Sequence, residues 1–86
     1  MKLIRTERFD AAYRRLQPET REKVNKALRL LAADPHHPSL RLKKMLGESM
    51  IWEARVDRRH RMTLEIQGDL YVLRGVGKHD ETLKQP

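Results

Sequence analysis

Apolar and polar residues alternate along the chain with two different periods. In the first part, apolar residues recur every three to four positions, as they do on one face of an α-helix. The two apolar stripes are Phe9, Ala12, Tyr13, Leu16 and Val24, Ala27, Leu28, Leu31. They predict two consecutive amphipathic helices joined by a short connection, which is a helical hairpin.

Residues with known preferences for helix ends bound both predicted helices. Thr6 can cap the first helix, because its hydroxyl can accept a hydrogen bond from a backbone N–H of the first turn. Pro18 suits the first position of the second helix, where its missing N–H costs nothing. Asp34-Pro35 should end that helix, because a residue before proline disfavours the α region.

After Pro38 the period changes to two, which is typical of strands with one buried face. Strands are predicted at Met1–Arg5, around Leu40–Lys43, and at 51–56, 61–66 and 70–76, with turns at Gly47–Met50 and Gly68-Asp69. Residues 77–86 are polar and are predicted to be irregular. The fold class that follows is α+β: a short N-terminal strand, a two-helix hairpin, and a twisted, mainly antiparallel sheet of three to four strands, with the helices on one face.

The composition excludes several classes of protein but does not identify the binding partner. With 86 residues, the chain is predicted to be a single domain, 1–86. It has 19 Lys and Arg against 12 Asp and Glu, a net charge of +7, which favours a polyanionic partner such as nucleic acid. The absence of cysteine excludes disulfides and thiolate chemistry. Because no apolar run is long enough for a signal peptide or a membrane span, we expect a cytoplasmic protein with no membrane partner.

The predicted strand register gathers three arginines on one face of the sheet. A two-residue turn at Gly68-Asp69 would set Thr63 opposite Arg74, with Arg61 diagonal to it. The preceding loop would then set Arg55 opposite Arg61. Like charges on one sheet face oppose folding, whereas guanidinium groups bind phosphate well.

Two interpretations of this arginine cluster remain open. The cluster is a phosphate site, or Glu53 and Glu65 on the same face neutralise it as a salt-bridge network. A second basic group, Arg41, Lys43 and Lys44, is either a docking surface for a nucleic-acid backbone or a solvated edge strand whose lysines prevent aggregation.

Histidines are the remaining candidates for chemistry. The spacing of His36, His37, His60 and His79 matches no known set of metal ligands, so we predict no metal and no cofactor. His79 follows a predicted strand, and Asp80 beside it can orient the ring for acid–base work at a phosphodiester. The alternative is an inert histidine in a loop.

Several short strings in this order resemble the RelE/ParE superfamily of toxins from type II toxin–antitoxin modules. They are His37-Pro38-Ser39-Leu40, Leu42-Lys43, Trp52-Glu53-Ala54-Arg55-Val56, Arg61-Met62 and Leu73-Arg74-Gly75-Val76-Gly77-Lys78-His79-Asp80. The resemblance covers nearly the whole chain. It implies a compact α+β fold, neutralisation by a cognate antitoxin, and one of two targets: RelE-like members cleave mRNA on the ribosome, and ParE-like members poison DNA gyrase.

The resemblance also implies roles for individual residues. Arg61 matches the arginine that stabilises developing charge on the phosphate, and His79 falls where RelE-like enzymes place a basic or acid–base residue. Arg55 and Arg74 match positions that are often basic. The chemistry implied is metal-independent attack by the mRNA 2′-hydroxyl on the adjacent phosphate, with RNA contacts expected from Arg41, Lys43, Lys44, Arg58, Arg59 and Lys78.

The chain departs from the RelE-like pattern at two places. Leu83 stands nearest to the position of a tail tyrosine that several nucleases use, and Ile51 and Glu53 replace a pair of lysines found in some members. The general acid and base are therefore unassigned. A ParE-like gyrase inhibitor and a non-catalytic nucleic-acid-binding module remain as alternatives to the endoribonuclease.

Overall fold

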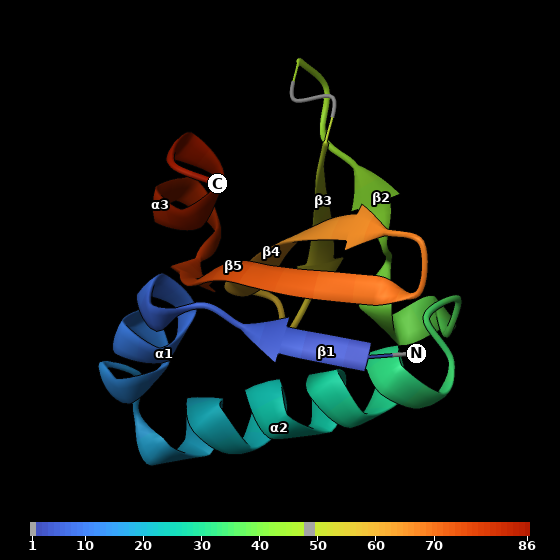
Figure 1. The fold of residues 1–86 in the computed structure, drawn as a ribbon. Helices are drawn as coiled ribbons and strands as arrows, with labels where there is room; N and C mark the ends of the chain where they lie inside the picture. Colours follow the sequence, from blue (N-terminus) through green and yellow to red (C-terminus); the bar gives the residue numbers. More distant parts are fainter. Residues whose placement is uncertain (1, 48–49) are drawn as a thin grey trace.

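A computed structural model describes residues 2–47 and 50–86, so Met1 of the predicted first strand and Glu48-Ser49 of the predicted turn lie outside the described residues. The elements in chain order are β1 (Lys2–Arg5), α1 (Glu7–Arg14), α2 (Pro18–Ala33), the 3₁₀ helix η1 (Pro38–Leu40), β2 (Lys43–Lys44), β3 (Ile51–Arg55), β4 (His60–Gln67), β5 (Leu70–Lys78) and α3 (His79–Lys84). The order confirms the predicted α+β class (Figure 1).

The strands form a single five-stranded sheet in the order β1-β5-β4-β3-β2. Strands β2 to β5 pair antiparallel with their neighbours, and β1 adds a parallel pairing at the β5 edge. The β4–β5 connection is the predicted turn: Gln67 pairs with Leu70, and Gly68 takes a positive φ of 60°, which costs glycine little.

Local signals set the helix ends as predicted. The Thr6 side chain accepts a hydrogen bond from the backbone N–H of Phe9 at 3.1 Å, which caps α1. Pro18 opens α2, and Asp34 is the residue that ends it. The two helices are linked by the hydroxyl of Tyr13, which donates to Oδ1 of Asn25 at 2.7 Å.

The core lies between the helices and one face of the sheet. The buried residues of α1 and α2 all come from the predicted stripes: Phe9, Val24, Ala27 and Leu31. The sheet contributes Ala54, Met62, Leu64, Tyr71, Leu73 and Val76 to the same cluster. Figure 1 shows α2 running along this side of the sheet, while α3 stands on the opposite side. We call the second side, which faces away from α2, the open face.

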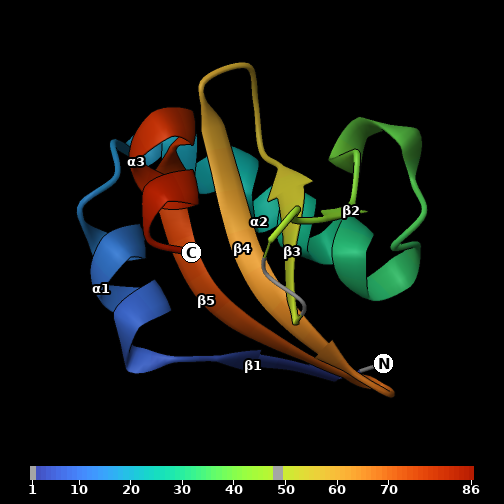
Figure 2. The same ribbon diagram turned by 90° about the horizontal axis from the view of Figure 1, so that it is seen from above.

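Two predictions of local structure are wrong. The strand expected around Leu40–Lys43 is confined to Lys43–Lys44, because Leu40 belongs to η1 and Arg41 takes a left-handed φ of 45°. The stretch expected to be irregular contains the end of β5 and the helix α3, which packs on β4 and β5 over the open face (Figure 2). Thr82 is the buried residue of α3, so this helix has no apolar stripe to reveal it.

Candidate functional site

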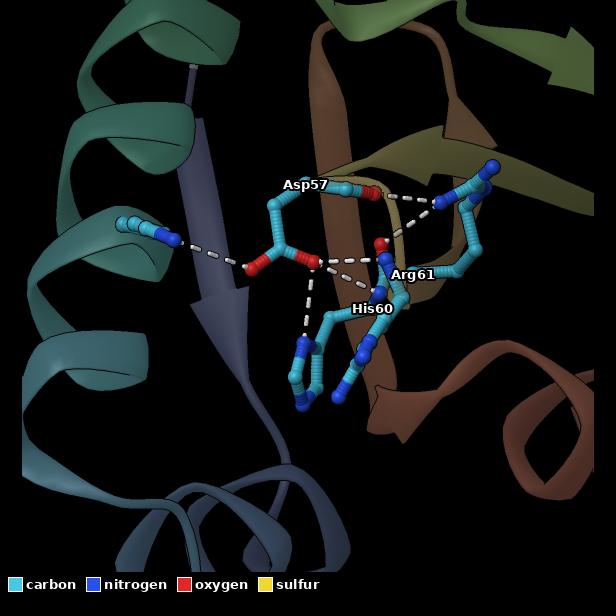
Figure 3. A network of polar contacts seen from close by, with 5 residues as sticks. Asp57, His60 and Arg61 are labelled. Carbon is cyan, nitrogen blue, oxygen red and sulfur yellow. Dashed lines mark hydrogen bonds and ion pairs between the residues drawn. The ribbon is translucent and has the colours of Figure 1, made fainter.

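The loop before β4 is held by bonds among its own polar groups (Figure 3). Oδ1 of Asp57 accepts hydrogen bonds from the backbone N–H groups of Arg59 and His60, both at 2.8 Å, and lies 2.9 Å from Nδ1 of His60. Oδ2 of Asp57 faces Nζ of Lys23 on α2 at 3.5 Å. These contacts tie the loop to α2 and fix the backbone at the start of β4.

Asp57 remains ionised well below neutral pH. Burial raises its pKa, but the hydrogen bonds from the His60 side chain and from the N–H groups of Arg59 and His60 outweigh burial and lower the pKa from 3.8 to about 2. Because a carboxylate can only accept hydrogen bonds, Nδ1 of His60 carries the proton that the two residues share. The His60 side chain is 16% exposed, and its other ring nitrogen, Nε2, has no hydrogen bond to a described residue.

Arg61 leaves the same loop toward the other side of β4. Its Nη1 donates to the carbonyl oxygens of Asp57 at 2.6 Å and of His60 at 2.9 Å. Figure 3 shows the Arg61 side chain and the His60 ring on opposite sides of the strand, as expected for neighbouring residues. Both bonds use Nη1, so Nε and Nη2, which bond no other described residue, can meet an anion on the open face.

Arg55 lies opposite Arg61 in the β3–β4 ladder, which confirms the predicted pairing. Arg55 also borders a hollow of about 250 Å³ between the sheet and α2, together with Lys23 and Lys26. The end of the sheet where β3 and β4 are joined is therefore basic on both sides.

Arg74 does not lie where the sequence places it. A β-bulge in β5 sets Thr63 opposite Gly75 and Leu64 opposite Leu73, so Arg74 is the extra residue and has no partner strand position. Its Nη1 lies 2.6 Å from Oε1 of Glu65, and its Nε donates to the carbonyl oxygen of Pro86 at 3.0 Å.

The sequence left open whether Glu53 and Glu65 neutralise the arginine cluster. The structure shows this for one arginine, Arg74, which pairs with Glu65. Arg74 and Glu65 border a hollow of about 450 Å³ with Arg8 and Pro86. Glu53, the other candidate, faces Lys43 at 3.7 Å and pairs with no arginine among the described residues.

His79 is the first residue of α3 and sits at the same end of the sheet as Arg61. Its backbone N–H donates to the carbonyl oxygen of Arg59 at 2.7 Å. Its Nδ1 lies 3.2 Å from Oδ1 of Asp80, the residue expected to orient it, but the Asp80 side chain is 93% exposed and holds the ring weakly. His79 borders a hollow of about 350 Å³ with Arg59 and Lys78.

The structure divides the predicted site residues into three groups. Six lie around the β3–β4 loop and the β5–α3 junction: Arg55, Arg58, Arg59, Arg61, Lys78 and His79. Arg74 lies in the bulge, two to three positions along β4 from Arg61 or about 7–10 Å, and is held in its pair with Glu65. Arg41, Lys43 and Lys44 lie at the β2 edge and are exposed.

The sequence analysis did not predict the Asp57–His60 pair, although this pair positions the whole β3–β4 loop. The signal is present as an aspartate three residues before a histidine in a polar connection, where Asp side chains commonly bond nearby backbone N–H groups. Within residues 2–47 and 50–86, no three His, Cys, Asp or Glu side chains gather as a metal site. None of the described helices is long and apolar enough to cross a membrane.

Solved structures share this architecture. The YoeB/ParE toxin from Agrobacterium tumefaciens matches with a TM-score of 0.76 at 21% identity, over 92% of this chain and 99% of its own. A chain of the RelB-RelE antitoxin–toxin complex from Methanococcus jannaschii matches with a TM-score of 0.74 at 15% identity, over 96% and 98%. A chain of the Escherichia coli DinJ-YafQ toxin–antitoxin complex matches with a TM-score of 0.76 at 13% identity, over 92% of both chains.

These matches show that the chain has the fold of these RelE, YafQ and YoeB/ParE toxin structures, which confirms the fold that the resemblance of its sequence strings implied. No family model and no curated protein matches the sequence. The likeness therefore rests on the architecture of the whole chain.

Proposed function

We propose that this protein is the toxin of a type II toxin–antitoxin module and acts in the cytoplasm as a ribosome-dependent endoribonuclease on mRNA. The observation that carries the proposal is Arg61, whose guanidinium is fixed by two carbonyl oxygens at the basic end of a RelE/ParE-type sheet. Similar solved chains belong to toxins and to toxin–antitoxin complexes, which supports a toxin role and a cognate antitoxin as partner.

The reaction proposed needs no metal. The 2′-oxygen of the mRNA forms a bond to the adjacent phosphorus, the bond from phosphorus to the 5′-oxygen breaks, and a proton moves from the 2′-hydroxyl toward the leaving oxygen. Arg61, with Arg55 opposite it, would stabilise the charge that grows on the phosphate. His79 at the same end of the sheet would transfer a proton.

Arg74 has a different proposed role. Because Glu65 holds its guanidinium at 2.6 Å, we assign Arg74 to positioning the RNA and the chain tail, not to the reacting phosphate. The exposed cations Arg41, Lys43, Lys44, Arg58, Arg59 and Lys78 would contact the RNA backbone of mRNA and ribosome.

A cleavage assay with purified components tests the proposal. A defined mRNA is incubated with the protein, once with initiated ribosomes and once alone, and new 5′ ends are mapped. Cuts that need ribosomes are expected. Uncut mRNA in both reactions, with translation unaffected, would contradict the endoribonuclease.

A gyrase poison is the second candidate, and the chain's tail favours it. Leu83 stands near the position of the tail tyrosine, and Glu65 neutralises one of the four residues expected to catalyse. A supercoiling assay with purified DNA gyrase decides between the two: inhibition at micromolar protein, with intact mRNA, would assign the ParE-like function.

A further inference from the structure

A second basic hollow adjoins the one that holds His79. It has a volume of about 460 Å³ and lies between the end of α1, the start of α2, the start of β4 and the end of β5. The two hollows share Arg59, Lys78 and Glu81, so they lie side by side at the end of the sheet. We call the larger one the Arg15 hollow.

Three cations from three different elements surround the Arg15 hollow. Arg15 ends α1, Arg59 lies in the β3–β4 loop, and Lys78 ends β5; all three are exposed, against a single carboxylate, Glu81. Cations that converge from separate elements repel one another in the free protein, which favours an anion between them.

The backbone that carries these cations is held in place. Arg59 donates its N–H to Asp57 and accepts the N–H of His79 at its carbonyl oxygen, at 2.8 and 2.7 Å. His60, which also borders the hollow, has its Nδ1 bonded to Asp57. A site that is ordered before binding loses less conformational entropy when the ligand binds, so it binds more tightly.

We infer that the Arg15 hollow binds a backbone phosphate of single-stranded RNA that flanks the cleavage site, through Arg15, Arg59 and Lys78. The inference rests on the RNA substrate proposed above. RNA fits better than an acidic protein because the Arg15 hollow adjoins the hollow of His79, the residue proposed above to transfer a proton, so a strand bound there would lie beside that residue. The contact is to phosphate and does not depend on sequence.

Binding of a short fluorescein-labelled 2′-O-methyl oligouridine, measured by anisotropy across a salt series, tests the inference. This probe carries the phosphates but lacks the 2′-hydroxyl nucleophile, so it stays intact whether or not the protein is a nuclease. We expect Arg15→Gln and Lys78→Gln each to weaken binding by about threefold or more and to make the slope of log K against log salt about 0.7 less negative.

Arg14→Gln is the matched control, because Arg14 is the exposed neighbour of Arg15 with the same charge and borders no hollow described above. Affinity and slope unchanged in Arg15→Gln and Lys78→Gln, or lowered equally in Arg14→Gln, would overturn the inference. Probe binding that depends on Arg15 together with uncut mRNA would instead leave the site in place and remove the proposed endoribonuclease.

Discussion

At the scale of single residues, the side-chain hydrogen bonds that fix the candidate site lie mostly in the β3–β4 loop. One carboxylate, Asp57, bonds two backbone N–H groups and the ring of His60, and the loop carbonyls in turn hold Arg61. Charge-assisted bonds of this kind are about twice as strong as neutral ones. The position of Arg61 therefore depends on the ionised state of Asp57.

Replacing Asp57 with asparagine should destabilise the fold in a pH-dependent way. The folded pKa of Asp57 is lowered from 3.8 to about 2, so the carboxylate stabilises the protein above pH 4 and loses this effect as the pH falls toward 2. Urea unfolding should show Asp57→Asn less stable by about 1–2 kcal/mol at neutral pH, with the difference shrinking between about pH 4 and pH 2. Asp69→Asn in the exposed β4–β5 turn is the control, and a pH-independent gap for Asp57→Asn would contradict the account.

His79 should matter to the reaction and little to the fold. Its side chain is 47% exposed, and among the described residues its side-chain ion pair is with a solvent-exposed carboxylate, that of Asp80. His79→Gln should therefore keep the unfolding temperature while it slows ribosome-dependent cleavage by about 100-fold, the usual scale of a lost acid–base group. Lys84→Gln, an exposed change in the same helix, should leave the rate unaltered; an equal rate for His79→Gln would remove it from the mechanism.

At the scale of elements, the sequence predicts the helices and the hairpin, because periodic apolar residues and turn residues determine them. The two apolar stripes and the residues Thr6, Pro18 and Asp34 locate α1 and α2, and the Gly68-Asp69 turn sets the hairpin it closes. The β-bulge at Arg74 is not predictable in this way, because one extra residue shifts the register without disturbing the apolar run of β5.

The same distinction explains the candidate site. Arg55 and Arg61 are predicted as neighbours because loop length alone sets their pairing, whereas Arg74 is displaced by the bulge. The Asp57–His60 pair depends on side-chain bonds to the backbone, which have no periodic signature.

The docking of α3 gives a prediction about close packing. A Cβ added at Gly77 would lie 2.9 Å from Oγ1 of Thr82, closer than real contacts allow. Gly77→Ala should lower the free energy of unfolding by about 1–3 kcal/mol, as overpacking commonly does. The double variant with Thr82→Ala removes the hydroxyl and should regain part of the loss; a double variant no more stable than Gly77→Ala would show that α3 does not rest on Gly77.

At the scale of the whole molecule, the charge of +7 is spread over the chain, with +4 in residues 1–34 and +3 in residues 35–86. The fold brings a few of these charges together at one end of the sheet, on the loop before β4 and the junction between β5 and α3. The charge spread over the chain would therefore attract RNA in general, whereas the few charges gathered at one end of the sheet would act on the phosphate.

Primer extension on cellular mRNA tests the proposed cleavage through Arg61 most directly. The wild-type chain and Arg61→Ala are expressed, with Arg29→Ala on the exposed side of α2 as control. We predict new mRNA 5′ ends with the wild type and with Arg29→Ala, and a loss of cleavage of about 100-fold or more with Arg61→Ala, which removes charge stabilisation from the phosphate. Equal cleavage by Arg61→Ala and the wild type, or no cleavage by the wild type while translation continues, would contradict the account.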